Sequence, residues 1–188
     1  METKEKTIRK VYVFRGRILT VRNDDALMPN GDVRNREVVE HPGGVCVLPV
    51  QDDGTILLVE QFRYPYMEDV LEAPAGKLER GEDPFEAAQR ELREETGMVA
   101  AEYFDLGEDY PSPGYTNEVI HLYAARGLSD IGQQLDDDEF LNLKHVSFSQ
   151  ALTMIYNNEI KDSKTVMAVM KYNDLLNLGK LDDKKIEG

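Results

Sequence analysis

One helix in this chain is marked at both of its ends. Asp83 is a residue type that caps helix N-termini, and Pro84 fits the first helical position, where its missing N–H has no partner to lose. Gly97 readily adopts the left-handed conformation that ends many helices. The sequence therefore predicts a helix over residues 84–96. Its apolar side chains fall on one narrow stripe, which consists of Phe85, Ala88 and Leu92.

The same helix gathers three glutamates on one arc of its surface. Glu91 and Glu95 flank the apolar stripe, and Glu94 lies slightly further round the helix. Like charges three or four residues apart destabilise a helix by about 0.2–0.5 kcal/mol per pair. A solvated acidic face is the ordinary interpretation of such a run. A hard divalent cation would remove the repulsion, since carboxylate oxygens are its natural ligands, and we favour that interpretation.

The residues after position 44 predict a mixture of strands and helices. Two further helices are expected, over 148–158 with a capping box at Ser147 and Gln150, and over 163–178 with Gly179 at the end. This order indicates an α/β (α+β) domain over residues 44–188. The strands are expected near 45–50, 55–63, 70–73, 100–110, 118–125 and 140–146.

The first 43 residues predict a small antiparallel sheet. Polar and apolar residues alternate in short runs, and the pair Asn30-Gly31 is a strong hairpin signal. Three strands are expected, near 8–14, 17–27 and 32–41. A sheet of this size has too little core of its own, so we expect this subdomain, residues 1–43, to dock on the rest of the chain or on a second copy.

The charge balance restricts the partners. The chain has 22 basic and 36 acidic residues and a formal net charge of -14. Such a field repels nucleic acid and anionic lipid surfaces, so neither is an expected partner, and a phosphorylated substrate would need cations or local arginines. We find no apolar run long enough to span a bilayer, and the single Cys46 fits a reducing compartment, so we expect a cytoplasmic protein. Cys46 lies in an apolar run, which favours a buried thiol over a reactive one.

The acidic helix belongs to a longer pattern. Gly76 is followed by five residues, then Glu82, then seven residues, then Arg90-Glu91-Leu92-Arg93-Glu94-Glu95-Thr96-Gly97-Met98. Every fixed position of the Nudix box is filled at the right spacing, so the sequence resembles a Nudix hydrolase. That resemblance implies a Nudix α/β/α sandwich with a mixed sheet, preceded by the small N-terminal antiparallel β-sheet.

The resemblance also implies a role for each box residue. Glu91 and Glu95 match the metal-binding glutamates, and Glu94 is a further ligand, water partner or catalytic residue. Arg90 matches the arginine that orients a box carboxylate, and the carbonyl of Ala75 matches a backbone metal ligand. The implied metal is Mg²⁺, with Mn²⁺ as an alternative.

Three features outside the box resemble the ADP-ribose pyrophosphatase subgroup. Pro113 follows the box as that subgroup's marker proline does, and Arg63 ends a similar Glu-Gln-Phe-Arg segment. The N-terminal sheet resembles the part that subgroup members exchange within a dimer, where the pair Arg36-Glu37 would contribute to the nucleoside pocket, often that of the partner subunit. An ordinary Pro-Gly turn and a solvated arginine are the alternatives for the first two. The candidate substrate-binding residues are Arg36, Glu37, Arg63, Lys77, Ser112, Pro113 and Gly114.

The general base is expected in the acidic run over residues 136–139. The subgroup places a glutamate at the end of this loop, and Glu139 matches it best as catalytic residue and metal ligand. Asp137 and the box glutamates are the alternatives. The resemblance implies a homodimer that hydrolyses ADP-ribose to AMP and ribose 5-phosphate, or GDP-mannose or another nucleotide sugar. A non-catalytic Nudix-like regulator is the alternative of another class, but the intact box disfavours it.

Overall fold

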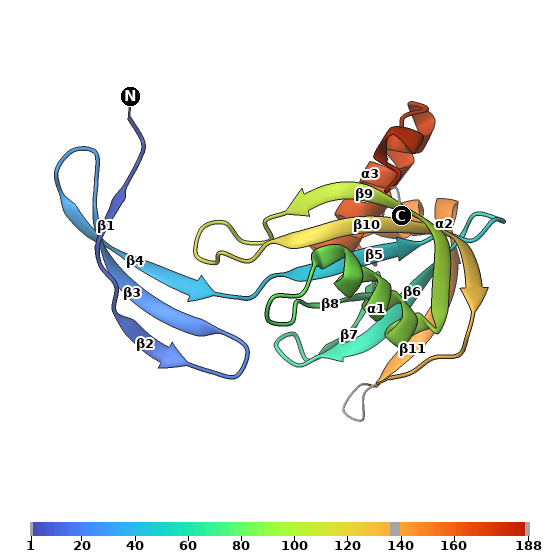
Figure 1. Ribbon diagram of the computed structural model, residues 1–188, viewed down its shortest axis with the longest axis horizontal. Coiled ribbons are helices and arrows are strands. Elements are labelled where there is room, and N and C mark those ends of the chain that lie inside the picture. The colour runs from blue at the N-terminus through green and yellow to red at the C-terminus, as the bar shows by residue number, and fades with distance from the viewer. Residues whose placement is uncertain (1, 136–139, 187–188) are drawn as a thin grey trace. The chain divides into compact units, whose positions relative to one another are not determined.

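The computed structural model describes residues 2–135 and 140–186 (Figure 1). The chain divides into two compact units. One consists of residues 1–43 and 110–119, and the other of residues 44–109 and 120–188. Among the described residues, no helix is long and apolar enough to cross a membrane.

The N-terminal unit is an antiparallel sheet built around one central strand. Its strands are β1 (Lys6–Arg9), β2 (Tyr12–Arg15), β3 (Thr20–Leu27) and β4 (Val33–Glu40). β3 pairs with all three of the others. The segment predicted as a single strand over 8–14 instead forms two strands, β1 and β2, which both pair with β3 and are separated by residues 10–11. The predicted turn at Gly31 joins β3 to β4, with φ of 88° at that glycine.

Residues 110–119 add to the edge of this sheet although they are distant from it in sequence. The N–H of Val39 donates to the carbonyl of Tyr115 at 2.7 Å, and the N–H of Asn117 donates to the carbonyl of Val39 at 3.1 Å. Val39 and Thr116 form a parallel bridge. The segment that contains Pro113 thus belongs to the N-terminal unit.

The second unit combines two sheets with three α-helices among its described residues. The mixed sheet has the order β8-β5-β10-β9, in which β5 and β10 are parallel, and the antiparallel sheet has the order β11-β6-β7. The strands are β5 (Gly44–Pro49), β6 (Thr55–Arg63), β7 (Glu68–Glu72), β8 (Ala75–Lys77), β9 (Met98–Asp109), β10 (Ile120–Asp130) and β11 (Leu141–Ser147). The helices are α1 (Pro84–Thr96), α2 (Phe148–Tyr156), α3 (Ser163–Asn177) and the short 3₁₀ helix η1 (Asp182–Lys184).

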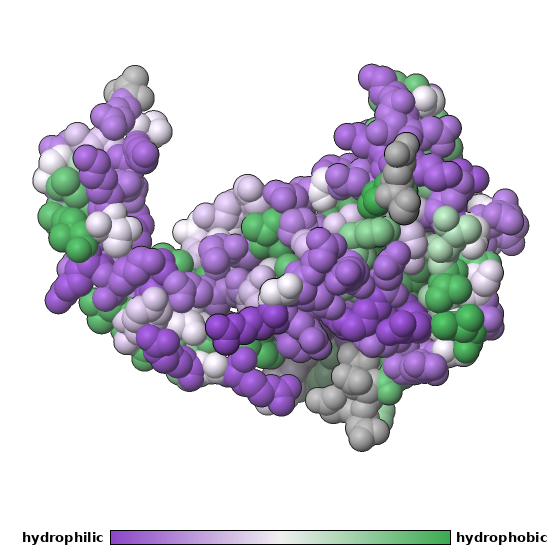
Figure 2. Space-filling model, viewed as in Figure 1, coloured by the Kyte–Doolittle hydropathy of each residue, from purple (hydrophilic) through white to green (hydrophobic). Residues whose placement is uncertain are grey.

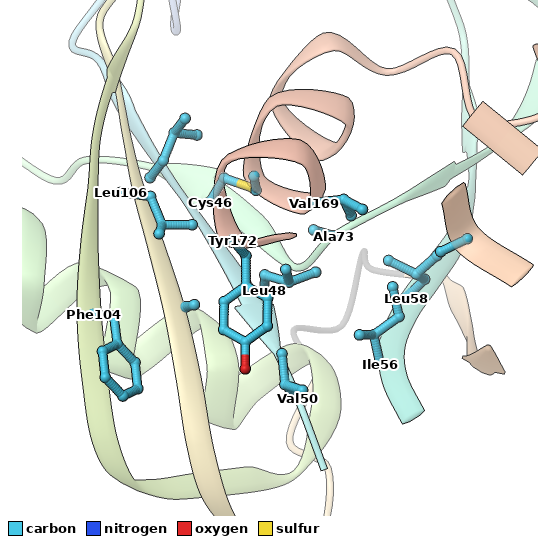
Figure 3. Packing of buried hydrophobic residues seen from close by; sticks show 14 of the residues in the cluster. Cys46, Leu48, Val50, Ile56, Leu58, Ala73, Phe104, Leu106, Val169 and Tyr172 are labelled. Carbon is cyan, nitrogen blue, oxygen red and sulfur yellow. The ribbon is translucent and has the colours of Figure 1, made fainter. Parts of the chain in front are cut away.

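Alternation along β5 sends side chains into two separate cores. Cys46, Leu48 and Val50 pack with α3 residues such as Val169 and Tyr172 (Figure 3). The intervening residues of β5, with α1, form the other core, whose members include Val45, Val47, Ala87, Ala88 and Leu92. Successive strand residues point to opposite faces, so one strand contributes to both cores. This is the layered sandwich that the sequence predicted. Cys46 is fully buried, as expected, and burial raises the pKa of its thiol, which keeps it protonated.

Candidate active site

Helix α1 begins and ends where its caps predict. The side chain of Asp83 accepts hydrogen bonds from the N–H groups of Phe85 and Glu86, and Gly97 has φ of 72° with its N–H bonded to the carbonyl of Arg93. Burial of the apolar face of α1 against β5 fixes the rotation of the helix. That rotation leaves Glu91 and Glu95 only 7% and 4% exposed, at the edge of the core.

Arg90 holds three box glutamates together. Its Nε and Nη2 donate to the two carboxyl oxygens of Glu82 at 2.8 and 3.1 Å. Its Nη1 donates to Glu91 Oε1 at 2.7 Å and to Glu94 Oε2 at 3.0 Å. The hydrogen bonds that Arg90 donates to Glu82, and then those to Glu91 and Glu94, raise the pKa of Arg90 above its usual value. The bond from Arg90 lowers the pKa of Glu82. One guanidinium therefore fixes the orientation of three carboxylates.

Strand β8 supplies a fitted wall for the two buried glutamates. The N–H of Ala75 donates to Glu95 Oε2 at 2.9 Å. A Cβ added at Gly76 would collide with all three atoms of the Glu91 carboxyl group. Only glycine at this position leaves room for Glu91 where it lies. Lys77, the third residue of β8, is exposed, and its carbonyl accepts a long bond of 3.5 Å from Arg90 Nη2.

The chemistry of this donor set fits a hard divalent cation. Glu91, Glu94 and Glu95 offer only carboxylate oxygens, the ligand type that Mg²⁺ and Mn²⁺ prefer. The carboxyl group of Glu91 occupies the space beside Gly76. In this structure, however, two of these glutamates bond to Arg90, and among residues 2–135 and 140–186 no three acidic, histidine or cysteine side chains converge as a metal site. We therefore assign the ligands from donor chemistry and not from coordination geometry.

Arg63 ends β6 and is tied to the last residue of β7. Its Nε and Nη2 donate to the two oxygens of Glu72 at 2.5 and 2.6 Å. The hydrogen bonds that Arg63 donates to Glu72 raise the pKa of Arg63, and the negative charge of Glu95 acts in the same direction. Arg63 therefore lies within electrostatic reach of the box, and it also lines a cavity of about 490 Å³ that extends to the start of α3.

Four of the other predicted binding residues meet in the N-terminal unit. Arg36, Glu37, Pro113 and Gly114 all line one cavity of about 260 Å³. Arg36 is paired there with Glu5, at 2.9 Å from Nε and 2.8 Å from Nη2. Of the remaining predicted residues, Lys77 lies on β8 in the second unit. Ser112 is not among the residues that line this cavity, although its carbonyl accepts from the N–H groups of Tyr115 and Thr116 in the adjoining turn.

The predicted general base cannot be placed, because Glu139 and its alternative Asp137 lie outside the described residues. The residues that lead to them can be placed. The N–H of Ile131 donates to the carbonyl of Gly97 at 2.8 Å, and the N–H of Gln134 donates to the carbonyl of Glu94 at 3.2 Å. The chain therefore runs along the C-terminal end of α1 immediately before the acidic run.

One cluster near Arg63 was absent from the sequence prediction. Glu72 is buried and binds both Arg63 and Lys164, and Lys164 in turn binds Asp162 at the N-cap of α3. A glutamate inside the apolar run Val70-Leu71-Glu72-Ala73 was the available signal, since a buried carboxylate requires a partner. The partner lies 92 residues away in the sequence, which local patterns do not reveal.

Comparison with known proteins agrees with the box and with the N-terminal sheet. The NUDIX domain model matches residues 40–169, and the model of the nucleoside diphosphate sugar hydrolase N-terminal domain matches residues 5–39. A solved structure described as an ADP compounds hydrolase is similar with a TM-score of 0.82 and 23% identity, over 94% of this chain and 97% of that chain. That likeness confirms the predicted fold.

Two curated relatives are similar over most of their length. The ADP-ribose pyrophosphatase of Bacillus subtilis (strain 168) is 42% identical over 167 residues, which cover 88% of this chain and 90% of that protein. The methanol dehydrogenase activator of Bacillus methanolicus is 45% identical over 167 residues, with the same coverage. With a domain match over more than half of its residues and these relatives, the chain belongs to the Nudix hydrolase family and is a pyrophosphatase of nucleoside diphosphate sugars.

Proposed function

We propose that this protein hydrolyses ADP-ribose to AMP and ribose 5-phosphate with Mg²⁺. The observation that carries the proposal is that three box glutamates surround Arg90 while the fourth, Glu95, bonds to the backbone of Ala75, an arrangement that concentrates carboxylate oxygens at the edge of the core. The choice of ADP-ribose is supported by the description of the Bacillus subtilis relative and by the residues outside the box that resemble the same subgroup.

Some box residues would bind the cation, and Arg90 would orient the carboxylates. Glu91 and Glu95 would hold the cation with the backbone of Ala75, while Arg90 holds Glu82, Glu91 and Glu94 in register. When bound, Mg²⁺ supplies charge neutralisation on the bridging phosphates and lowers the pKa of a water molecule. Arg63 would bind a phosphate oxygen, and Glu139 would accept the proton of the attacking water.

The nucleoside half would bind at the cavity of the N-terminal unit. Arg36 offers donors, Glu37 offers acceptors, and the Pro113-Gly114 turn forms another wall. This combination suits a base that carries both donors and acceptors. The guanidinium of Arg36 already bonds to Glu5, so its orientation is fixed before a ligand arrives.

We further propose a homodimer formed through the N-terminal sheet. Large apolar side chains on this sheet are exposed (Figure 2). Among the described apolar residues of the sheet, only Ala26 is buried. An uncovered apolar surface of this kind is typical of an interface. The exposed residues are Ile8, Tyr12, Val13, Phe14, Ile18, Leu19 and Val33. Light scattering after gel filtration should give twice 21.4 kDa, and a single-chain mass at micromolar concentration would contradict the proposal.

The substrate test is an assay of the products from a panel of nucleotide sugars and dinucleotides, with Mg²⁺ and after chelation. We expect the highest kcat/KM for ADP-ribose, with AMP and ribose 5-phosphate as products and no turnover after chelation. A higher kcat/KM for GDP-mannose would instead identify GDP-mannose as the preferred substrate. Tight ADP-ribose binding without hydrolysis of any panel member would favour a regulator.

The base has its own test. Glu139→Gln should lower kcat at least about tenfold, because it removes a proton acceptor while it keeps side-chain volume and substrate contacts. Asp137→Asn is the matched control, with the same loss of charge two residues earlier. If only Asp137→Asn is inactive, the assignment shifts by two residues. If both variants are active, the base must be one of the box glutamates.

A further inference from the structure

A buried cluster of charged side chains at the start of α3 surrounds Glu72. This carboxylate is 1% exposed, and Lys164 and Thr165, the second and third residues of α3, are also buried. Removing a carboxylate and an ammonium from water is costly, so such groups persist only where good geometry offsets the loss of solvation.

Glu72 is shared between two cations. Its Oε1 accepts from Arg63 Nε at 2.5 Å, and its Oε2 accepts from Arg63 Nη2 at 2.6 Å and from Lys164 Nζ. Lys164 Nζ also binds Asp162 Oδ1 at 2.8 Å. The other carboxyl oxygen of Asp162 caps α3 by accepting from the N–H of Thr165 at 3.0 Å. Lys164 is therefore fixed from both sides by carboxylates.

The cluster is electrically balanced. Arg63 and Lys164 bring two positive charges, and Glu72 and Asp162 bring two negative ones. Burial alone would lower the pKa of Lys164, but Asp162 and Glu72 raise it above its usual value, so Lys164 is charged at neutral pH. Without Lys164, Arg63 alone would face two carboxylates, and an approaching phosphate would meet one more unit of negative charge.

Arg63 differs from the rest of the cluster in its exposure. Its side chain is 39% exposed, against 11% for Lys164, and it lines the cavity of about 490 Å³. Glu72 takes up Nε and Nη2 on one edge of the guanidinium, and Nη1 has no hydrogen-bond partner among the residues that the structure describes. One edge is thus anchored, and the remaining donor is left for a ligand.

We propose that Lys164 is a positioning residue for substrate binding, because it shares the Glu72 carboxylate with Arg63 and so keeps the charge and the Nη1 edge of Arg63 available to a phosphate. The inference rests on the proposed role of Arg63 in the pyrophosphatase reaction. Lys164 itself touches no substrate in this scheme. It acts through Glu72, and its effect should appear in substrate affinity and not in the chemical step.

The test is a set of steady-state measurements of KM and kcat at saturating Mg²⁺. Lys164→Met should raise KM about tenfold with kcat changed less than about twofold, since a charged hydrogen bond to phosphate is weakened. Added to a Glu72→Gln background, the same substitution should change KM less than about twofold, because its route to Arg63 is gone. An equal increase in KM in both backgrounds would overturn the proposal.

Asp162→Asn gives a test of opposite sign, and it also serves if Lys164→Met does not fold. Asparagine caps helices as well as aspartate does, so α3 should keep its start. The loss of a negative charge leaves the cluster with an excess positive charge, so KM should fall or stay unchanged. A cluster with only a structural role would raise KM in both variants, and that result would overturn the proposal.

Lys171→Met is the matched control. Lys171 lies on the same helix, and its Nζ donates to the carbonyl of Leu106 at 2.7 Å, away from the cluster. It should lower the thermal midpoint without a change in KM. Arg63→Met distinguishes failure of the proposed phosphate-binding role of Arg63 from failure of the proposed positioning role of Lys164. If it leaves KM unchanged, the phosphate role of Arg63 fails and the positioning role fails with it. If it raises KM while Lys164→Met does not, only the positioning role fails.

Discussion

The substitution Gly76→Ala tests whether the Glu91 carboxylate is seated against strand β8. A Cβ at position 76 would strike all three carboxyl atoms of Glu91, and even the most distant, Oε2, would be only 2.5 Å away. Ordinary van der Waals contact begins at 3.4 Å, and the nearest carboxyl atom, Oε1, would be 1.8 Å away, so the carboxyl group must retreat by more than about 1 Å. Its bond to Arg90 at 2.7 Å opposes that retreat. The backbone of Gly76 lies outside the left-handed region, so alanine adds no backbone strain.

Two magnitudes follow from this displacement. Overpacking a filled site costs about 1–3 kcal/mol of unfolding free energy. For a chain of this length, that corresponds to a thermal midpoint lower by about 3–9 °C. A displacement of about 1 Å in a positioned group can reduce the rate about a hundredfold. We therefore expect a folded Gly76→Ala protein whose kcat at saturating Mg²⁺ is lower by about two orders of magnitude.

The assay compares the wild type, Gly76→Ala, Glu91→Ala and the double variant. If the clash is with the Glu91 side chain, Glu91→Ala should restore the thermal midpoint lost in Gly76→Ala while activity stays low. The two substitutions would then be non-additive in stability, as expected for groups in contact. Wild-type stability and rate in Gly76→Ala, or additive losses in the double variant, would refute the placement of Glu91.

Three further substitutions address the other parts of the protein. Glu95→Gln removes charge at nearly constant volume, so the fold should persist while kcat falls by at least about tenfold; near-wild-type hydrolysis at saturating Mg²⁺ would exclude Glu95 as a metal ligand. Glu72→Gln should lower the unfolding free energy at pH 7 by about 3 kcal/mol, because it removes one partner of a buried ion cluster. Burial raises the pKa of Glu72, but the hydrogen bonds from Arg63 and the charge of Lys164 outweigh this effect and bring the pKa below 4.5. The stabilisation that ionised Glu72 contributes is therefore present above pH 4.5 and is lost as the pH falls through the lowered pKa. Thermal midpoints of wild type and variant should therefore converge below pH 4.5, and a constant gap would contradict the assignment. Arg36→Ala should raise KM for ADP-ribose more than it lowers kcat, since the proposed role of Arg36 is to bind the nucleoside half; a loss confined to kcat would argue against that role.

Much of this protein was readable from local sequence. The bounds of α1 were predicted because its start signal, Asp83, and its stop signal, Gly97, act within one turn of the helix ends. The Nudix family followed from fixed residue types at fixed spacing, and the comparisons confirm it. The burial of Cys46 followed from its place in an apolar run. In each case the determining interaction lies within a few residues or depends on composition.

Other features required the tertiary structure. Strand β8 is only three residues long and contains Gly76, a poor strand former, so it exists because β5 pairs with it. The grouping of residues 110–119 with the N-terminal sheet depends on backbone bonds to Val39. No periodic pattern encodes such pairings, because the partners are separated by many residues and neither shows which segment it will meet.

The site itself divides in the same way. The sequence by itself determined which carboxylates belong to the box, because a helix places residues at i, i+3 and i+4 on one face. Only the tertiary structure decided how they are held. Gly76 seats Glu91 from a separate strand, Arg90 reaches back to Glu82, and Lys164 joins Glu72 from a helix 92 residues further on. Buried charges must find partners wherever the packed fold places them, and that requirement acts on distance in space and not on distance along the chain.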